Sequence, residues 1–213
     1  VDSEHNAIYQ VLDFKNKSHV SKLILTASGG PFLNRQKNDL KSVTPEEAVK
    51  HPNWSMGKKI SIDSATMMNK GLELIEAHFL FDFPHNKIEI VIHPESIIHS
   101  CVEYSDGSIL AQMGNPDMRT PIAYALAYPN RIETKVDRLK LSELNKLTFF
   151  EPDLLKFPCL ELAYESLKIK KSAPTILNAA NEIAVEAFLN EKIKFLSISK
   201  VVEKTLNKAS ISP

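Results

Sequence analysis

Short apolar segments of two kinds follow one another along the first 127 residues. Residues 88–92 alternate isoleucine with other residues, which predicts a strand, whereas residues 5–12 repeat apolar side chains at helical spacing. Asp106-Gly107 lies between two further apolar segments and is typical of a tight β-hairpin. The predicted strands are residues 22–26, 88–92, 98–104 and 108–113.

Helix starts are marked as clearly. Thr44, Pro45 and Glu47 are suited to the N-cap, first and third positions of a helix that stops near His51-Pro52. Two more helices are predicted, one at 69–81 with the stripe Leu72, Ile75 and Phe79, and one from Thr120 to just before Pro129.

Every periodic segment after residue 153 is helical. We expect three apolar stripes to form its core: Phe157, Leu160, Tyr164 and Leu167; Leu177, Ala180, Ile183, Ala184, Ala187 and Phe188; Ile198, Val201, Val202 and Leu206. Residues 128–153 lack periodicity and are interpreted as a linker. The predicted fold is α+β: a small mixed sheet with helices over 1–127, followed by a helical domain over 154–213 whose last helices are expected to be incomplete.

The chemistry is concentrated in residues 59–73. A β-like stretch at 60–62 leads into hydroxyl side chains and then into a predicted helix, so the run is interpreted as a strand-to-helix junction. Helix N-termini attract anions and carboxylates attract divalent cations, so such a junction can hold a phosphate beside a metal. The polar residues concerned are Ser64, Thr66, Asn69, Lys70 and Glu73.

Each of these residues also has a plainer interpretation. Lys70 opposes the helix dipole, which indicates a nearby anion or else a solvated lysine. Ser64, Thr66 and Asn69 are also ordinary capping groups. Glu73 is a metal ligand or a complement to the dipole, and Glu76 is a solvated or capping residue.

Two further segments admit a ligand. Asp2 and Glu4, two residues apart, would point the same way in an extended segment and bind Mg²⁺ or Mn²⁺, or they are an acidic cap for the helix that follows. Ser28-Gly29-Gly30 lets backbone N–H groups approach a phosphate, or is a plain turn.

A polar loop and two strands hold the remaining candidates. In the loop of His51, Trp54 and Met56, an aromatic and a methionine can close over a ligand or pack on their own domain. Two strand histidines, His93 and His99, are structural by default. Met118 lies in a turn and helix entry.

Bulk properties exclude several classes. The 213 residues balance 26 Lys+Arg against 26 Asp+Glu, so no basic footprint indicates nucleic acid or an anionic membrane. No apolar run reaches the length of a membrane span. Cys101 and Cys159 form no CxxC and are expected to be small buried hydrophobes in a reducing compartment. We expect Val1 and Pro213 to be cuts inside a longer protein.

Six motifs in one order give the chain a family resemblance. They are Val1-Asp-Ser-Glu-His-Asn-Ala-Ile8, Ser28-Gly-Gly-Pro-Phe32, His51-Pro-Asn-Trp-Ser-Met-Gly57, Asp63-Ser-Ala-Thr-Met-Met-Asn-Lys-Gly-Leu-Glu73, His93-Pro-Glu-Ser-Ile-Ile-His99 and Gly114-Asn-Pro-Asp-Met-Arg119. With the late Leu177-Asn-Ala-Ala-Asn-Glu-Ile183, they make nearly the whole chain resemble the 1-deoxy-D-xylulose 5-phosphate reductoisomerase family.

The resemblance implies a substrate rearrangement, by a retro-aldol/aldol path, followed by reduction with NADPH to 2-C-methyl-D-erythritol 4-phosphate in non-mevalonate isoprenoid biosynthesis. It implies that Mg or Mn is bound by Asp2, Glu4 and Glu73. The implied substrate contacts are Ser3, Ser28, His51, Ser64, Asn69, Lys70, Ser96 and His99, with Trp54 and Met56 in a closing flap. Glu4, Lys70 and His51 are the implied catalytic residues, and Met56 and Met118 the implied nicotinamide contacts.

The family's NADPH domain has no counterpart here, since the sequence contains no GxGxxG segment. We therefore expect this segment alone to be inactive. The family implies a homodimer and a bacterial cytoplasmic or plastid setting. A metal-dependent sugar-phosphate hydrolase and a non-catalytic sugar-phosphate binding module remain as alternatives; phosphate release without NADPH would favour the first.

Overall fold

A computed structural model describes residues 1–52, 54 and 56–211, and the chain divides into two compact units. Unit 1 comprises Val1–Ser28 and Asn86–Glu151, and unit 2 comprises Gly29–His85 and Pro152–Pro213. Asn53 and Ser55 of the predicted flap, and Pro213, lie outside the described residues. The domain boundaries derived from the sequence stay a prediction.

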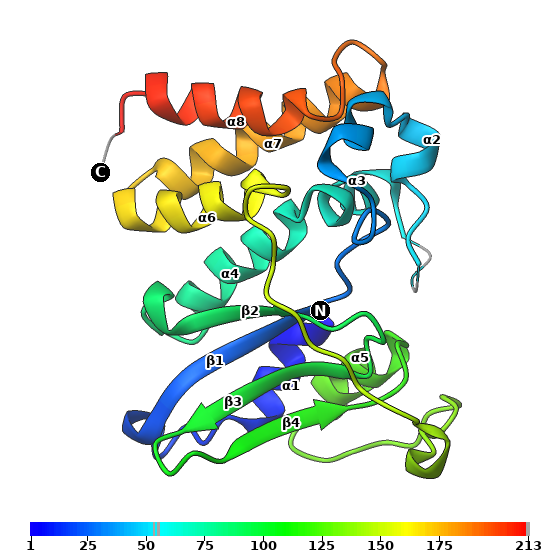
Figure 1. Ribbon diagram of the computed structural model, residues 1–213. Coiled ribbons are helices and arrows are strands. Elements are labelled where there is room, and N and C mark those ends of the chain that lie inside the picture. The colour runs from blue at the N-terminus through cyan, green and yellow to red at the C-terminus, as the bar shows by residue number, and fades with distance from the viewer. Residues whose placement is uncertain (53, 55, 212–213) are drawn as a thin grey trace. The chain divides into compact units, whose positions relative to one another are not determined.

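Unit 1 is built on a four-stranded mixed sheet in the order β2-β1-β3-β4 (Figure 1). Strand β1 pairs in parallel with β2 and antiparallel with β3, and β3 pairs antiparallel with β4. The predicted hairpin is confirmed, with Gly107 at φ 85°, a conformation that glycine adopts without strain. The strands are β1 (Val20–Ala27), β2 (Ile88–Ile92), β3 (Ile98–Tyr104) and β4 (Ile109–Met113).

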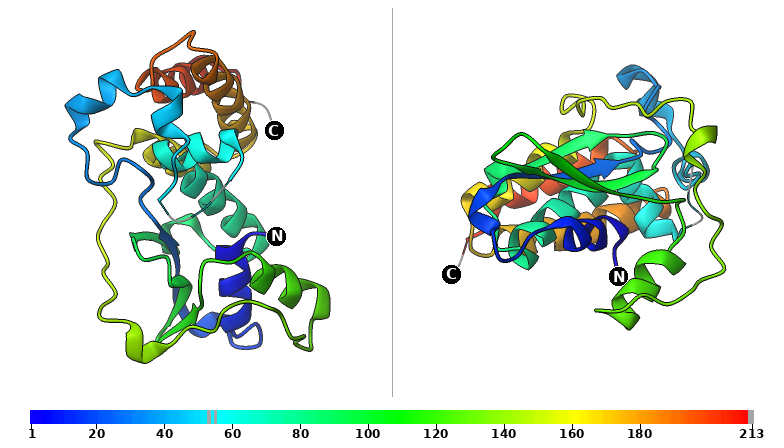
Figure 2. Two further views of the ribbon diagram at one scale, coloured as in Figure 1. Left: turned by 90° about the vertical axis from the view of Figure 1, so that its right-hand side faces the viewer. Right: turned by 90° about the horizontal axis from the view of Figure 1, so that it is seen from below.

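One face of this sheet is covered by a helix from the start of the chain. Helix α1 (Ser3–Val11) packs against β3 and β4 (Figure 2), and Ile8 and Val102 are fully buried there. Helix α5 (Arg119–Ala127) contacts α1 and ends before Pro129, as predicted. Short 3-10 turns complete the unit: η1 (Lys17–His19), η3 (His85–Lys87) and η4 (Leu141–Glu143).

The linker segment of unit 1 is held to the sheet by its own backbone and by one histidine. Phe150 forms an isolated antiparallel bridge with Ile92. The backbone N–H of Ile97 donates to Nε2 of His93, so Nδ1 carries the proton that is donated to the Thr148 carbonyl at 2.9 Å. The fully buried His93 also stacks on Phe149. The structural interpretation of His93 is thereby confirmed.

The regular secondary structure among the described residues of unit 2 is all helical. Helix α4 packs on α3 and α6, α3 contacts α7, and α7 lies along α8. The predicted start of α2 is confirmed, with a complete capping box between Thr44 and Glu47. The elements are η2 (Lys37–Ser42), α2 (Pro45–Ala48), α3 (Lys58–Thr66), α4 (Met68–Leu80), α6 (Pro158–Ile169), α7 (Ala173–Leu189) and α8 (Ser197–Lys208).

The predicted strand at 60–62 is wrong, because these residues belong to α3. The Ser61 hydroxyl donates to the carbonyl of Gly57 four residues back at 2.9 Å, a bond that only helical geometry provides. Ser61 and Ile62 are both buried while Ile60 is 40% exposed, so burial follows a helical face and not an alternation. The junction is therefore helix-to-helix.

Two residues assigned to apolar stripes are also on the wrong face. Phe79 and Ile183 are each 66% exposed. In α4 the buried face is the one that carries Gly71, Leu74 and Ala77, because a Cβ on Gly71 would lie 2.7 Å from the Ala163 Cβ of α6.

Other sequence expectations hold. Cys101 and Cys159 are free and buried, and burial raises the pKa of the Cys101 thiol to about 11. Among the described residues no helix has the length and hydropathy that crossing a membrane requires.

Candidate functional site

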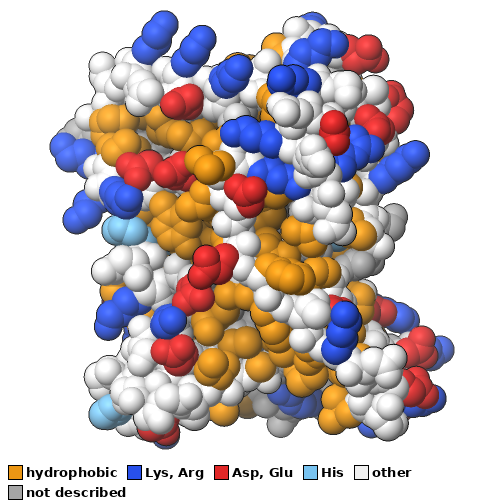
Figure 3. All heavy atoms as spheres, viewed as in Figure 1, with side chains coloured by type: hydrophobic (Ala, Val, Ile, Leu, Met, Phe, Trp, Pro, Cys, Tyr) orange, Lys and Arg blue, Asp and Glu red, His pale blue; other side chains and the backbone are white. Residues whose placement is uncertain are grey.

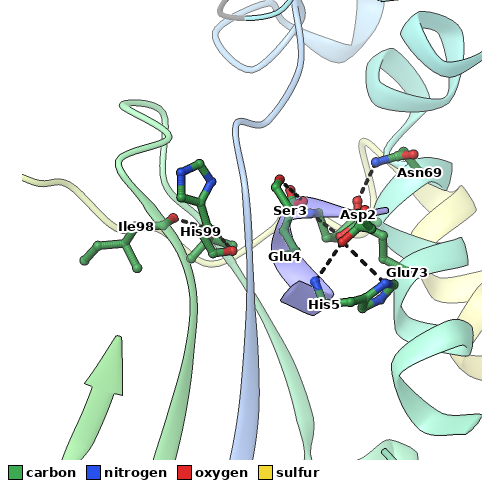
Figure 4. A network of polar contacts seen from close by, with 10 residues as sticks. Asp2, Ser3, Glu4, His5, Asn69, Glu73, Ile98 and His99 are labelled. Carbon is green, nitrogen blue, oxygen red and sulfur yellow. Dashed lines mark hydrogen bonds and ion pairs between the residues drawn. The ribbon is translucent and has the colours of Figure 1, made fainter. Parts of the chain in front are cut away.

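The first two turns of α4 hold a cation and a carboxylate that are both buried. Lys70 is 4% exposed and Glu73 is 3% exposed. Lys70 Nζ lies 2.5 Å from Glu73 Oε2, and Asn69 Nδ2 donates to Glu73 Oε1 at 2.6 Å (Figure 4). Charged groups are almost never buried in this way unless they are paired, so these turns form an electrostatic cluster and not a solvated helix face.

The burial of this cluster shows that Lys70 is not a solvated lysine. A lysine in the first turn of a helix is repelled by the positive end of the helix dipole, and burial adds the cost of removing its charge from water. The Glu73 carboxylate one turn later offsets both effects. Lys70 therefore presents a fixed positive charge, held in place by a neighbouring anion, beside the N-terminus of α4.

The turn between α3 and α4 is tightly fixed. Met67 connects the helices with a left-handed backbone at φ 63° and is 2% exposed. The Thr66 hydroxyl accepts from the backbone N–H of Met68 and donates to the carbonyl of Asp63. Thr66 is thus a capping group, one of its two predicted interpretations.

Two segments predicted to bind phosphate meet inside unit 2. Gly30 has φ 68°, and a Cβ placed on it would lie 2.6 Å from the carbonyl oxygen of Ser64. Only glycine permits this approach of one backbone to the other. The end of α3 and the Gly29-Gly30 segment are therefore in direct contact.

In unit 1, Asp2 and Glu4 lie at the start of α1. Asp2 is the N-cap: its Oδ1 accepts from the backbone N–H of His5 at 2.7 Å, so the capping interpretation is confirmed. Glu4 belongs to the helix, so the two residues do not share an extended segment as supposed. Ser3 Oγ donates to Glu4 Oε2 at 2.6 Å, which orients that carboxylate (Figure 4).

Three other residues that were predicted as substrate contacts lie at one edge of the sheet in unit 1. The carboxyl ends of the parallel strands β1 and β2 and the start of antiparallel β3 lie at the same edge. Ser28 directly follows β1, Ser96 closely precedes β3, and His99 lies within its first residues. Ser96 has a left-handed backbone at φ 53°, a conformation that costs free energy and is frequent at functional sites.

The same edge is braced by Thr26 of β1. Its hydroxyl lies 2.7 Å from the Ile98 carbonyl and 2.8 Å from the His99 carbonyl. This contact fixes the backbone that carries the buried His99.

The predicted flap residues lie in an irregular segment of unit 2. His51 Nδ1 accepts from the backbone N–H of Trp54 at 3.0 Å. Nδ1 therefore carries no proton, and Nε2 is the nitrogen that bears the hydrogen of the neutral ring. Trp54 and Met56 are half-buried. In unit 1, Met118 is half-buried at the N-cap of α5.

Sequence reasoning missed a buried polar pair. Asp63 of α3 and Asn181 of α7 are 1% and 0% exposed, and Asn181 Nδ2 donates to Asp63 Oδ1 at 2.8 Å. Lys59 Nζ lies 2.7 Å from Asp63 Oδ2. Burial nevertheless raises the pKa of Asp63, because the side chain of Lys59 is 43% exposed and its charge is screened by water. The sequence signal for this pair is limited to the position of Asp63, an acidic residue directly before Ser64.

Known proteins share this fold. A reductoisomerase structure from Zymomonas mobilis in complex with NADPH superimposes with a TM-score of 0.93 and 55% identity, over 100% of this chain and 55% of that one. A second reductoisomerase, in complex with NADPH, fosmidomycin and magnesium, gives 0.94 and 54% identity, over 98% and 54%.

Curated relatives agree. The 1-deoxy-D-xylulose 5-phosphate reductoisomerase of Acetivibrio thermocellus is 57% identical over 213 residues, and that of Chlorobium phaeobacteroides is 60% identical over 206. These alignments cover 100% and 97% of this chain but 56% and 54% of the relatives. The chain thus spans about half the length of the curated relatives it matches.

Two family models cover most of the chain. Residues 1–81 match the 1-deoxy-D-xylulose 5-phosphate reductoisomerase C-terminal domain, and residues 113–213 match the DXP reductoisomerase C-terminal domain. The α+β fold and these matches place the chain within a class of reductoisomerases. It belongs to the 1-deoxy-D-xylulose 5-phosphate reductoisomerase family and corresponds to part of such an enzyme.

Proposed function

We propose that this chain forms the metal- and phosphate-binding part of an NADPH-dependent 1-deoxy-D-xylulose 5-phosphate reductoisomerase. The product would be 2-C-methyl-D-erythritol 4-phosphate, a precursor of isoprenoids. The observation that carries the proposal is the start of α4, where the buried Lys70 is paired with the buried Glu73 one turn later and Asn69 donates to the same carboxylate. A buried cation and a buried anion on successive turns of one helix supply what a phosphorylated, metal-chelating substrate requires.

The metal ligands are proposed to be Asp2, Glu4 and Glu73. Their donor chemistry fits, since all three are carboxylates and Mg²⁺ and Mn²⁺ prefer oxygen ligands. Two neighbouring reductoisomerase structures contain magnesium, which supports this choice. The bound metal would polarise substrate oxygens and stabilise negative charge during rearrangement. Ser3 would orient Glu4 through the bond from its hydroxyl.

The substrate phosphate is proposed to bind at the N-terminus of α4. Lys70 would supply the charge and Asn69 an amide donor, assisted by the hydroxyls of Ser64 and Ser28. The contact of Gly30 with the Ser64 carbonyl supports this assignment, because it brings the glycine segment to the end of α3. Helix N-termini are ready-made anion sites, so the backbone contributes as well.

The remaining contacts are proposed from the family. His51, whose Nε2 bears a hydrogen, would donate to a substrate oxygen, and Ser96 and His99 would line the pocket. Trp54 and Met56 would close over the substrate and exclude water. Glu4, Lys70 and His51 are proposed as the residues that act in catalysis.

Hydride transfer requires NADPH, which two related structures contain. Met56 and Met118 are proposed to approach the nicotinamide. We expect the 213-residue chain on its own to oxidise no NADPH when given substrate and Mn²⁺. Robust NADPH consumption by this chain would contradict that expectation.

We also propose a homodimer that uses the sheet of unit 1. Strand β4 lies at one end of the strand order among the described residues, and its residues Ile109 and Met113, which share the face opposite α1, are exposed. Figure 3 shows hydrophobic side chains gathered over this part of the view. Exposed apolar side chains on the edge strand of a sheet are typical of an interface. The relatives are bacterial, which supports a bacterial cytoplasmic setting.

Sedimentation analysis tests the dimer. Ile109→Lys should convert the dimer to a monomer, whereas Ile132→Lys, at an equally exposed position outside the strands, should not. A dimer that survives Ile109→Lys would exclude β4 as the interface.

Calorimetric titration with fosmidomycin tests the proposed site. Fosmidomycin binding should require Mg²⁺. Glu73→Gln should abolish this Mg²⁺-dependent binding, because the variant lacks one of the proposed metal ligands. Glu76→Gln alters an exposed residue of the same helix and is the matched control. Equal binding by both variants would refute Glu73 as a ligand.

A further inference from the structure

The α3–α4 turn is fixed from inside unit 2 by a polar contact between residues far apart in the sequence. Asp63 and Asn181 are 118 positions apart and both buried, with Asn181 Nδ2 donating to Asp63 Oδ1 at 2.8 Å. Asp63 immediately precedes Ser64, and its carbonyl accepts from the Thr66 hydroxyl. The Asp63–Asn181 contact therefore connects α7 to the residues that form the turn.

A second helix reaches the same point. The thiol of Cys159, in α6, interacts with the Thr66 hydroxyl, and complete burial raises the pKa of that thiol to about 12. The end of α3 is thus held from two sides, by a side chain of α6 and by one of α7. These contacts fix Thr66 and, through the hydrogen bond from its backbone N–H to the Thr66 hydroxyl, Met68.

A buried polar pair is a poor way to gain stability alone. Asn181 Oδ1 is buried and has no hydrogen-bond partner among the described residues. Leaving a buried acceptor unsatisfied is unfavourable, and an apolar pair of similar volume would avoid this. What a directional hydrogen bond adds is a defined orientation, because its strength falls steeply away from good geometry.

We propose that Asn181, through Asp63, is a positioning residue that holds the α3–α4 turn in the shape from which Ser64, Asn69 and Lys70 bind an anion. The effect on anion binding rests on the proposed function, whereas the effect on the shape of the turn does not. Asn181 is not itself one of the proposed ligands and would act only through α3.

The test compares three variants of this chain with wild type. Asn181→Ala removes the contact, and Asn178→Ala alters a half-buried asparagine of the same helix as a matched control. Asp63→Asn combined with Asn181→Asp exchanges the partners: the amide introduced at position 63 donates to the carboxylate introduced at position 181, and the amide oxygen accepts from Lys59. Cooperative thermal unfolding is checked first for each variant.

Amide hydrogen exchange is the readout that a general loss of stability would not reproduce. Asn181→Ala should speed exchange at 67–71 at least about tenfold while α8 amides change less than about twofold, since local opening and global unfolding expose different amides. Asn178→Ala should change neither, and the exchanged pair should restore most of the protection. Uniform acceleration across the turn and α8, or none at the turn, would overturn the proposal.

Titration with inorganic phosphate separates the two claims. The affinity should fall at least fivefold in Asn181→Ala and stay within twofold of wild type in Asn178→Ala. If wild type binds no phosphate, the proposed phosphate site fails while the exchange data still judge the turn. If Asn181→Ala loosens the turn but binds phosphate normally, Asn181 does not position the anion site.

Discussion

Replacing Lys70 with Met leaves the carboxylate of Glu73 buried without the cation that lies 2.5 Å away. The side chains of the pair are only 5% and 4% exposed, so water cannot take over the role of the lysine. Removal of one partner from a buried ion pair destabilises proteins by about 3–5 kcal/mol. For a chain of this size that corresponds to a fall in Tm of roughly 6–20 °C.

The chain contains a matched control for this perturbation. Lys168 and Glu165 form a pair with the same three-residue separation at 2.6 Å, but their side chains are 58% and 46% exposed. Exposed pairs contribute about 0–1 kcal/mol, so Lys168→Met should barely alter stability. The two substitutions are chemically identical, and the pairs differ in burial and in the order of the two residues along the helix.

A double-mutant cycle measures the coupling directly. Urea unfolding of Lys70→Met, Glu73→Gln and the double variant should give a coupling of at least about 2 kcal/mol, because neutralising Glu73 relieves the charge that Lys70→Met leaves unpaired. The same cycle at Lys168 and Glu165 should give about 0.5 kcal/mol or less. Equal, small coupling in both cycles would refute the view that the α4 cluster is a buried electrostatic unit.

Three other results are expected. Asp2→Asn should keep the N-cap of α1, and so the stability, but should weaken Mn²⁺ binding. Asp2→Ala should weaken Mn²⁺ binding and also lower the free energy of unfolding in urea by about 1 kcal/mol. Equal Mn²⁺ affinity in Asp2→Asn and wild type would show that Asp2 is a helix cap and not a metal ligand. Burial raises the pKa of Asp63 above its ordinary 3.8, so the folded state favours the protonated acid, and the stability that this acid contributes is lost as the pH rises above that value. The free energy of unfolding of Asp63→Asn should therefore rise relative to that of wild type between about pH 3.5 and about pH 6. A difference that is independent of pH would contradict this. Gly30→Ala should weaken phosphate binding and lower Tm because its Cβ meets the Ser64 carbonyl, while Gly57→Ala, with open space around it, should leave phosphate binding unchanged.

Local patterns were sufficient for the sheet and for several helix ends. The alternation at 88–92 predicted β2, and the turn at Asp106-Gly107 predicted the β3–β4 hairpin. Both predictions succeed because the period of a strand and the backbone conformation of a tight turn depend only on residues close together in the sequence. The capping box at Thr44 likewise depends on a few residues in sequence. Motif order was sufficient for the family.

Features that depend on distant partners were out of reach. Three alternating residues at 60–62 could not decide between strand and helix, and the decision is made by burial of Ser61 and Ile62 in unit 2. The stripe that ends at Phe79 failed because Gly71 sets which face of α4 approaches α6. The Asn181–Asp63 contact joins residues whose local sequences give no sign of each other.

Electron paramagnetic resonance of Mn²⁺ added to this chain tests the central claim most directly. We expect one bound Mn²⁺ in wild type and in Glu76→Gln, and at least a tenfold loss of affinity in Glu73→Gln and in Asp2→Asn. Inorganic phosphate should alter the spectrum of the bound ion in wild type and not in Lys70→Met. Mn²⁺ binding that is unchanged by Glu73→Gln and Asp2→Asn would contradict the proposed metal site.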